Sequence, residues 1–497
     1  MKIGPYAIEQ DYSYYVAYVA KSILAVVGTA TKGPINEPTL INSPSELTAK
    51  FGPVNPNCFG LYAGHYFLHQ ADKLWFVRAA TDSATEATVN IAGTSNSTPV
   101  TDMIKLKSVE KSSYYNGFKV IITVNPDDTF SLVIKDKSAA QTTLESHKNL
   151  SLNTFEDSFV SKYLKVVSVT LAEGATSKVT ADTYTLADGN DGITDITSAD
   201  FIEALNTLDT TNIDMNLLAI PGISDESVVQ AGLTLCESRG DTLYIVDPPK
   251  GLDADGVQQW HNGEGTYSHT KFNSSYGALY YDWQVIYDSI NKVNVEVPPS
   301  VVVGATIAQS DRMTEPWFAP AGLRRGLVKN VIRSVSNPDK KKTEMLYSDD
   351  NNINSIVIDP QVGLCVFGQK TLWRSPTALN RVNVRRLLNY LKRVIVAACT
   401  YLTFEPNDRI TWNYFEDMVE PVLKSVKNKR GLYDYRIVKG ETIVTDEDID
   451  NYRMPCQILL KPTKAAEEIP IYFTITRTGA EFDEILGTSE YIETTSV

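Results

Sequence analysis

The sequence has few of the residues on which most catalytic and metal sites depend. Its 497 residues include only five histidines and five cysteines. No two cysteines have CxxC spacing and their number is odd, so neither a zinc knuckle nor a disulfide framework is indicated. We expect five buried thiols in a reducing compartment.

Long hydrophobic runs are also missing. The most apolar stretch near the N-terminus, residues 14–30, is interrupted by Lys21 and preceded by Glu9 and Asp11. A secretory signal would carry positive charge ahead of its apolar run, and a membrane span needs about 20 apolar residues. We therefore expect neither a signal peptide nor membrane insertion.

The motifs of common cofactor sites do not occur. The sequence has no GxGxxG, no GxxxxGK[ST] and no GxSxG. His65 and His69 have the i, i+4 spacing of a metal pair, but no third ligand is evident, so packing is the favoured interpretation. Asp247 ends a predicted strand, yet Pro248 and Pro249 follow it and favour a rigid turn. We expect no catalytic residue, no metal and no cofactor.

The charge balance is acidic, with 46 basic and 60 acidic side chains and a formal charge of −14. A protein that coats nucleic acid needs clustered cations, so direct nucleic-acid binding is not expected. Basic residues do gather locally, between residues 374 and 404 and again at Lys424, Lys427, Lys429 and Arg430. A solvated face, a docking face for an acidic partner protein and, least favoured, nucleic acid remain as explanations.

Composition and hydrophobic pattern predict an α/β and α+β multidomain protein. Residues 21–90 and 189–375 alternate between strands and helices and form one discontinuous α/β domain. Residues 91–188 are rich in Ser and Thr and indicate an inserted, mostly β domain. Residues 376–497 form an α+β domain, and residues 1–20 an extended arm.

The individual elements follow from periodicity and from turn residues. Ser224 is expected to cap the helix that ends at Gly240, and Pro421 to lie within the last long helix. Helices are predicted at 43–52, 61–70, 224–240, 380–402 and 412–426. Strands are predicted at 22–28, 74–79, 119–124, 129–134, 164–170, 178–186, 215–221, 241–249, 456–462 and 469–478.

Several segments, in order, resemble the sheath subunits of contractile phage tails and related injection machines. The stretches VNVRRLLNYLKRVIVAACTYLTFEPND and ITWNYFEDMVEPVLKSVKNKRGL resemble that family most closely. LADGNDG, GALYYDWQVIYD, NINSIVIDPQVGLCVFGQKTLW and KPTKAAEEIPIYFTITRTG agree with it. PPSVVVGATIAQSDRMTEPWFAPAG resembles a family strand followed by a turn and a Trp-containing loop.

The resemblance implies a structural subunit without a catalytic site, and thus not an enzyme. It also implies that the inserted domain, residues 91–188, lies outward and that residues 376–497 serve sheath assembly and the tube contact. Such subunits stack around a tube, and N- and C-terminal arms add strands to sheets of neighbouring subunits. Here the arm would be Tyr6–Val16, the receiving strands Ile458–Lys461 and Ile471–Thr476, and a second donated strand Tyr491–Thr495. The implied interface residues are Tyr6, Ile8, Tyr12, Tyr14, Ile458, Leu460, Ile471, Phe473, Ile475, Tyr491 and Ile492.

The resemblance also implies partners. They are further copies of this chain, a tail tube protein, and baseplate and tail terminator proteins. The tube-facing residues would be Lys424, Lys427, Lys429 and Arg430, and the location a virion tail assembled in the host bacterial cytoplasm. Two other classes stay open from the residues alone: an α/β hydrolase-like enzyme and a monomeric binding module.

Overall fold

The computed structural model describes residues 21–171 and 177–471. The chain separates into two units, residues 1–463 and 464–497. In the second unit the described residues, 464–471, contain neither helix nor strand. All elements given below belong to the first unit.

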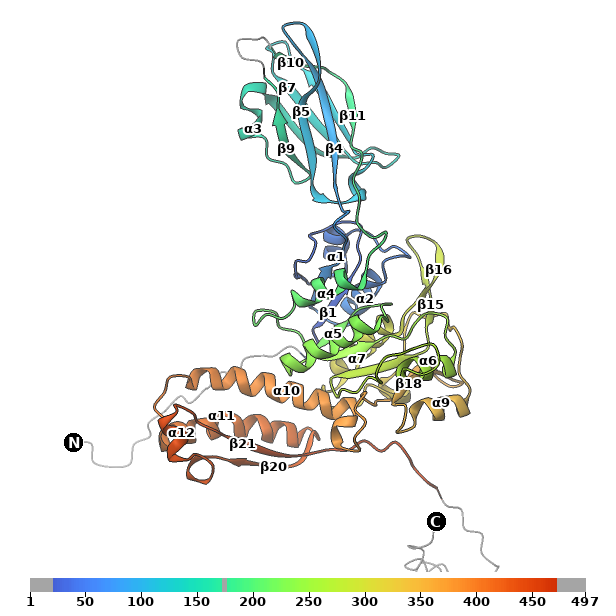
Figure 1. The fold of residues 1–497 in the computed structure, drawn as a ribbon, viewed down its shortest axis with the longest axis vertical. Coiled ribbons are helices and arrows are strands. Elements are labelled where there is room, and N and C mark those ends of the chain that lie inside the picture. The colour runs from blue at the N-terminus through green and yellow to red at the C-terminus, as the bar shows by residue number, and fades with distance from the viewer. Residues whose placement is uncertain (1–20, 172–176, 472–497) are drawn as a thin grey trace, which may run out of the picture. The chain divides into compact units, whose positions relative to one another are not determined.

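A mixed sheet of eight strands forms the middle of this unit (Figure 1). Six strands run parallel, and the strands at the two edges, β19 and β2, are antiparallel to their neighbours. The order is β19 (Gly363–Phe367), β18 (Ile353–Asp359), β14 (Gly277–Tyr281), β13 (Leu243–Val246), β12 (Leu217–Ala219), β1 (Leu24–Gly28), β3 (Leu74–Arg78) and β2 (Thr39–Ile41). The predicted α/β architecture of the middle domain is confirmed.

Helices cover both faces of this sheet, which explains why its central strands are continuous apolar runs. One face packs on α1 (Pro44–Phe51), α2 (Phe59–Leu68) and α7 (Pro299–Met313). The other packs on α4 (Ser198–Asn206), α5 (Glu226–Arg239), α6 (Ala254–Asn262) and α9 (Lys340–Tyr347). The remaining elements of this domain are α8 (Gly322–Arg325), η3 (Ala378–Asn380) and a small sheet of β15 (Gln284–Asp288), β16 (Val293–Val297) and β17 (Arg333–Ser334).

Two sequence predictions in this domain are wrong. The segment expected as a strand from PPSVVVGATIAQSDRM is helix α7, with Pro299 in its first turn. Every residue from Pro299 to Asp311 is buried, so the helix has no polar face whose period could reveal it. The cap of α5 is Asp225, not Ser224: the Asp225 carboxylate accepts a hydrogen bond from the backbone N–H of Ser227.

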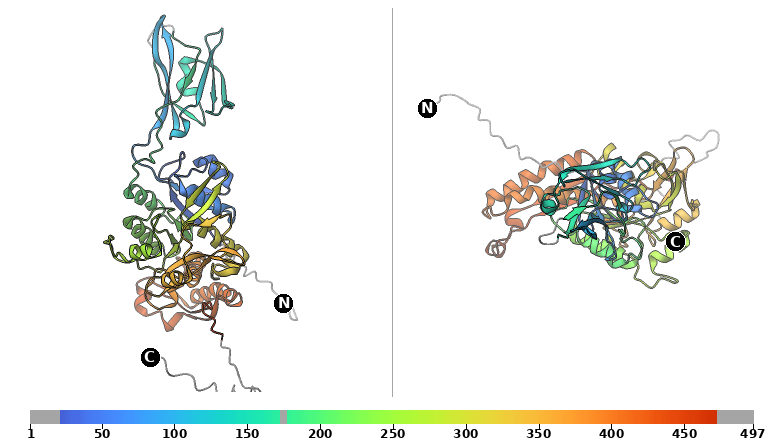
Figure 2. Two further views of the ribbon diagram at one scale, coloured as in Figure 1. Left: turned by 90° about the vertical axis from the view of Figure 1, so that its right-hand side faces the viewer. Right: turned by 90° about the horizontal axis from the view of Figure 1, so that it is seen from above.

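The inserted domain consists of two four-stranded sheets that enclose one apolar core; Figure 2 shows them from a second side. One sheet has the order β10 (Ser177–Val179), β4 (Glu86–Ser95), β5 (Thr98–Lys111) and β9 (Leu164–Val169). The other has the order β11 (Thr183–Thr185), β6 (Lys119–Val124), β7 (Phe130–Lys135) and β8 (Thr143–Leu150). Short helices η1 (Ser113–Tyr115), η2 (Leu152–Thr154) and α3 (Phe155–Ser158) complete it.

The predicted strand 178–186 is therefore two strands in different sheets, because the chain crosses from one sheet to the other between β10 and β11. The domain begins at β4, at Glu86, rather than at residue 91. The segment that enters the inserted domain and the segment that leaves it lie side by side: Thr85 pairs with Asn190, and Thr88 with Ala187. Both connections to the middle domain thus lie at one place.

The last domain packs two long antiparallel helices on a two-stranded sheet (Figure 1). The helices are α10 (Val382–Cys399), continued by η4 (Thr400–Leu402), and α11 (Arg409–Asn428). The sheet is formed by β20 (Leu432–Val438) and β21 (Gln457–Pro462), with η5 (Gly440–Thr442) and α12 (Asp446–Asp450) between them. Both predicted long helices are confirmed, with Pro421 inside α11.

Candidate assembly site

The β20–β21 sheet presents two edges to which further strands can be added. The two strands pair antiparallel with each other, from Leu432 opposite Pro462 to Val438 opposite Gln457. Among residues 21–171 and 177–471 no third strand joins this sheet. Because an open edge exposes a row of unpaired N–H and C=O groups, it is a template for strand addition.

One face of the sheet packs against α10 and α11, and the other faces outward. Ile458 and Leu460, two of the predicted interface residues, contact the domain's own core. Their neighbours on the opposite face, Leu459 on β21 and Tyr433 on β20, are 47% and 62% exposed. An added strand would therefore bind through the backbone of β20 or β21, and its side chains would lie beside these two faces.

Most of the other predicted interface residues lie outside the described residues: Tyr6, Ile8, Tyr12, Tyr14, Phe473, Ile475, Tyr491 and Ile492. Ile471 is described and is 70% exposed. The strand that the structure pairs with β21 is β20, which the sequence reasoning missed. The apolar residues Tyr435 and Ile437, two positions apart, were a possible signal for it, although a register shift separates them from Leu432.

The four predicted tube-facing residues have different environments. Lys427 forms an ion pair with Asp434 of β20, at 2.8 Å, and Lys429 forms one with Glu315, at 2.9 Å. Lys424 and Arg430 are exposed, and no carboxylate in the described part of the chain pairs with either. Two of the four charges are therefore neutralised within the subunit, and two are not.

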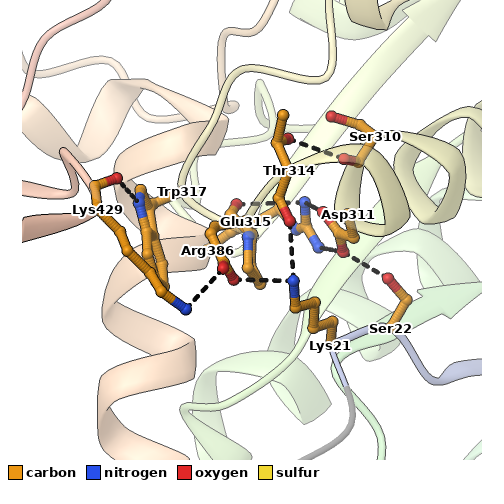
Figure 3. Close-up of polar contacts among 10 residues, drawn as sticks. Lys21, Ser22, Ser310, Asp311, Thr314, Glu315, Trp317, Arg386 and Lys429 are labelled. Carbon is orange, nitrogen blue, oxygen red and sulfur yellow. Dashed lines mark hydrogen bonds and ion pairs between the residues drawn. The ribbon is translucent and has the colours of Figure 1, made fainter. Parts of the chain in front are cut away.

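Glu315, which follows α7, connects three segments that are far apart in sequence (Figure 3). One carboxylate oxygen binds Lys429 after α11, and the other binds Lys21 at 3.0 Å, next to the predicted arm. Burial alone would raise the pKa of Glu315, but the hydrogen bonds from Lys429 and Lys21 lower it below its usual value. The same pairing raises the pKa of Lys429.

Further hydrogen bonds fix the start of the described chain at this junction. The Lys21 ammonium donates to the carbonyl oxygen of Thr314 at 2.8 Å. Asn216, before β12, donates to the Lys21 carbonyl and accepts from the backbone N–H of Ile23. Lys21, the residue that follows the predicted arm, is thus held by the middle domain.

A buried ion pair lies beside these contacts (Figure 3). Arg386 of α10 binds Asp311 of α7 through two nitrogens, one of them 2.8 Å from an Asp311 oxygen. Their side chains are 4% and 1% exposed. Asp311 also accepts from the Ser22 hydroxyl, and Arg386 donates to the carbonyl oxygen of Pro316. This pair links the last domain to the middle domain next to the first described residues.

The residues considered for catalysis have structural partners. Asp247 is buried and accepts hydrogen bonds from the backbone N–H groups of Gly222 and Ser300 and from the Ser300 hydroxyl. Burial raises the pKa of Asp247 to about 6. These bonds hold the start of α7 against the end of β13, as expected for a rigid turn rather than a catalytic acid.

His65 lies within hydrogen-bond distance of the Thr48 hydroxyl, 3.1 Å away, and burial lowers its pKa. The described ranges contain no group of three or more His, Cys, Asp or Glu side chains placed to hold a metal ion. No helix in those ranges is long and apolar enough to cross a membrane.

Residues 374–477, which contain α10, α11 and the β20–β21 sheet, match the protein family described as the phage tail sheath C-terminal domain. The chain is also 26% identical over 432 residues to the tail sheath protein of Enterobacteria phage T4. The predicted relationship to tail sheath proteins is confirmed. The alignment covers 78% of this chain but only 64% of the phage T4 protein, so the chain matches less than two thirds of that relative.

The fold is similar to solved sheath structures over most of its length. A sheath tail protein from Listeria innocua superimposes with a TM-score of 0.65 at 12% identity, covering 90% of this chain and 93% of that one. A subunit of the sheath complex of an extracellular contractile injection system, in its contracted state, gives a TM-score of 0.55 at 16% identity, with 95% and 98% covered. These sheath relatives are structural proteins rather than enzymes.

Proposed function

We propose that this chain is the structural subunit of a contractile tail sheath. It polymerises around an inner tail tube and contracts by rigid-body rearrangement, which drives the tube through the envelope of a target cell. The observation that supports this most strongly is that no third described strand pairs with either edge of the β20–β21 sheet, within the domain that matches the sheath family. Strand exchange through such edges gives a continuous lattice without chemistry.

The links between subunits are strands donated by the arms. Residues Tyr6–Val16 of one copy, and Tyr491–Thr495 of another, would add to the two edges of the sheet. A backbone hydrogen bond contributes about 1 kcal/mol net, so a strand of several pairs contributes a few kcal/mol. Such a link is strong enough to hold the lattice when many act together, and flexible enough to persist while the subunits rotate.

The junction at Glu315 gives the arm a fixed origin. Lys21 is bound both by the middle domain, at Thr314 and Asn216, and by a carboxylate shared with the last domain. A force on the arm is therefore transmitted to both the middle domain and the last domain. This is the property required of a subunit that moves as one body.

The basic end of α11, Lys424 to Arg430, is the proposed contact with the tube. Lys424 and Arg430 carry charges that no described carboxylate neutralises. Ion pairs at exposed positions contribute little, about 0–1 kcal/mol each, and are screened by salt. A contact of this kind can break during contraction. Baseplate and terminator proteins would close the two ends, in a virion tail assembled in the host cytoplasm.

The test is negative-stain electron microscopy of the full chain and of a variant without residues 1–20. We expect tubes or rings from the full chain and only small particles from the deletion variant, with unchanged circular dichroism. Val160→Ser, which alters an 80% exposed apolar side chain in the inserted domain, should assemble normally. Small particles from the full chain, even with tube protein present, would contradict the proposal.

A further inference from the structure

Three arginines gather where the middle domain meets the start of β20. Arg324 and Arg325 belong to α8, and Arg430 lies between α11 and β20. The two segments are held together by Trp317, whose indole N–H donates to the Lys429 carbonyl at 3.0 Å. A side chain at position 431 would collide with that indole, so Gly431 permits the close approach.

Among residues 21–171 and 177–471, these arginines have no carboxylate partner. Arg325 is fixed by a hydrogen bond from its Nε to the Ala319 carbonyl and lies over the Phe318 ring, 5.2 Å from its centre. No carboxylate in the described part of the chain pairs with Arg324, Arg325 or Arg430. Burial lowers the pKa of Arg325, and the charges of Arg324 and Arg430 lower it further. In a chain of net charge −14, three cations held together indicate a place for an external anion.

The position of the cluster indicates what that anion is part of. Arg430 precedes Leu432, the first residue of β20, by two positions. The ion pair between Lys427 and Asp434 keeps the end of α11 beside the same strand. A segment that continues from a strand added along β20 would therefore pass the arginines.

The chain supplies a segment of matching charge at its C-terminal end. Residues 481–497, EFDEILGTSEYIETTSV, contain five acidic side chains and no basic one, and they include the proposed donated strand. The other dense acidic run, α12, uses Asp448 to cap its own helix and to bind Arg453. The tail is therefore the better match.

We propose that the arginine cluster of one copy binds the acidic segment Glu481–Glu484 of a second copy's tail, and thereby sets the register of the donated strand. This proposal rests on the proposed function. A two-residue error in register keeps the same side chains on the same face, so the backbone alone discriminates poorly against it. Charge-assisted hydrogen bonds beside one end of the strand supply that discrimination.

The experiment is a charge exchange in the full chain. Arg324→Glu/Arg325→Glu, with Arg430 left unchanged because it also belongs to the proposed tube contact, should raise the critical concentration for assembly about tenfold. Glu481→Arg/Asp483→Arg/Glu484→Arg should do the same. The combined variant should assemble within about threefold of the original chain, which only a direct contact explains.

Controls separate this proposal from others. Arg324→Glu alone changes an exposed side chain that has no described partner, and it should raise the critical concentration by less than the double variant does. Thermal unfolding of dilute protein should show that every variant is folded. Lys148→Glu, which reverses an exposed charge in the inserted domain, should leave assembly unchanged. If the full chain assembles and the arginine variant assembles equally well, or the variant loses only binding to the tube protein, the inference is wrong and the proposed function stands. If the full chain never assembles, the function itself is wrong.

Discussion

Arg386 of α10 and Asp311 of α7 form a two-point ion pair that is almost completely buried between the last domain and the middle domain. Removal of one partner leaves the other as an uncompensated buried charge, which typically lowers the free energy of unfolding by about 3–5 kcal/mol. Replacement of both residues by neutral ones lowers it by less. The pair therefore fixes how the two domains meet more than it adds to total stability.

We predict that Arg386→Met lowers the free energy of unfolding by about 3–5 kcal/mol, and that Arg386→Met/Asp311→Asn lowers it by less. Urea denaturation of both variants and of Asp311→Asn gives a double-mutant cycle with a strong coupling energy. Additive effects would show that the two charges act independently.

A second prediction concerns the carboxylate that Lys21 and Lys429 share. Glu315→Gln should lower the free energy of unfolding by about 1 kcal/mol at pH 7, because two charge-assisted hydrogen bonds become neutral ones. The lowered pKa of Glu315 means that its contribution is present above the unfolded value of 4.5 and is lost as the pH falls through the folded value. The difference between original chain and variant should therefore shrink below about pH 4.5.

A matched control exists on α9. Lys340 and Glu344 form an exposed pair at 3.8 Å, with side chains 91% and 67% exposed. Glu344→Gln should change stability very little at either pH. Equal effects of Glu315→Gln and Glu344→Gln would refute a special role for Glu315.

The third prediction uses the raised pKa of Asp247. With a folded pKa of about 6 and a reference value of 3.8, the folded chain holds a proton that the unfolded chain has lost between these pH values. Stability should fall by about 2 kcal/mol from pH 4 to pH 7 because of this group. Asp247→Asn should remove that slope in chemical denaturation, although it also loses the hydrogen bond from Gly222. An identical slope in the variant would contradict the assignment.

The fourth prediction separates the lysines of α11. Lys424→Glu should weaken co-sedimentation with the tube protein several-fold, because this charge has no described partner within the subunit. Lys427→Glu should weaken it less, since Lys427 already pairs with Asp434. The triple reversal of Lys424, Lys427 and Lys429 should have the largest effect, and unchanged co-sedimentation of that variant would exclude this surface.

The sequence predicts elements well where one local pattern decides them. The helices of residues 382–399 and 409–428 are amphipathic, so their period is visible. Helix α7 is buried on all sides and carries three consecutive valines, so its sequence favours a strand and only tertiary packing makes it a helix. Strands β10 and β11 were merged because nothing in their alternation marks a change of sheet.

The assembly site was only partly predictable for a similar reason. The position of β21 follows from its short apolar run, Ile458 to Leu460, but its partner β20 begins immediately after a basic turn and contains Asp434 and Arg436. The junction at Glu315 joins Lys21 to Lys429 across more than 400 residues, and sequence order contains no sign of such contacts. The basic residues could be found in the sequence, but the sequence could not show which of them form ion pairs within the subunit.

The entry and exit of the inserted domain have a consequence for how such proteins diversify. Its two connecting segments run together, Thr85 beside Asn190 and Thr88 beside Ala187, so the domain is attached to the rest of the chain at one place. Replacement of the inserted domain by another would leave the eight-stranded sheet and the β20–β21 sheet unaltered. Under the proposed function, a different inserted domain would change the proposed outward part of the subunit, and the sheets proposed to link the copies would stay the same.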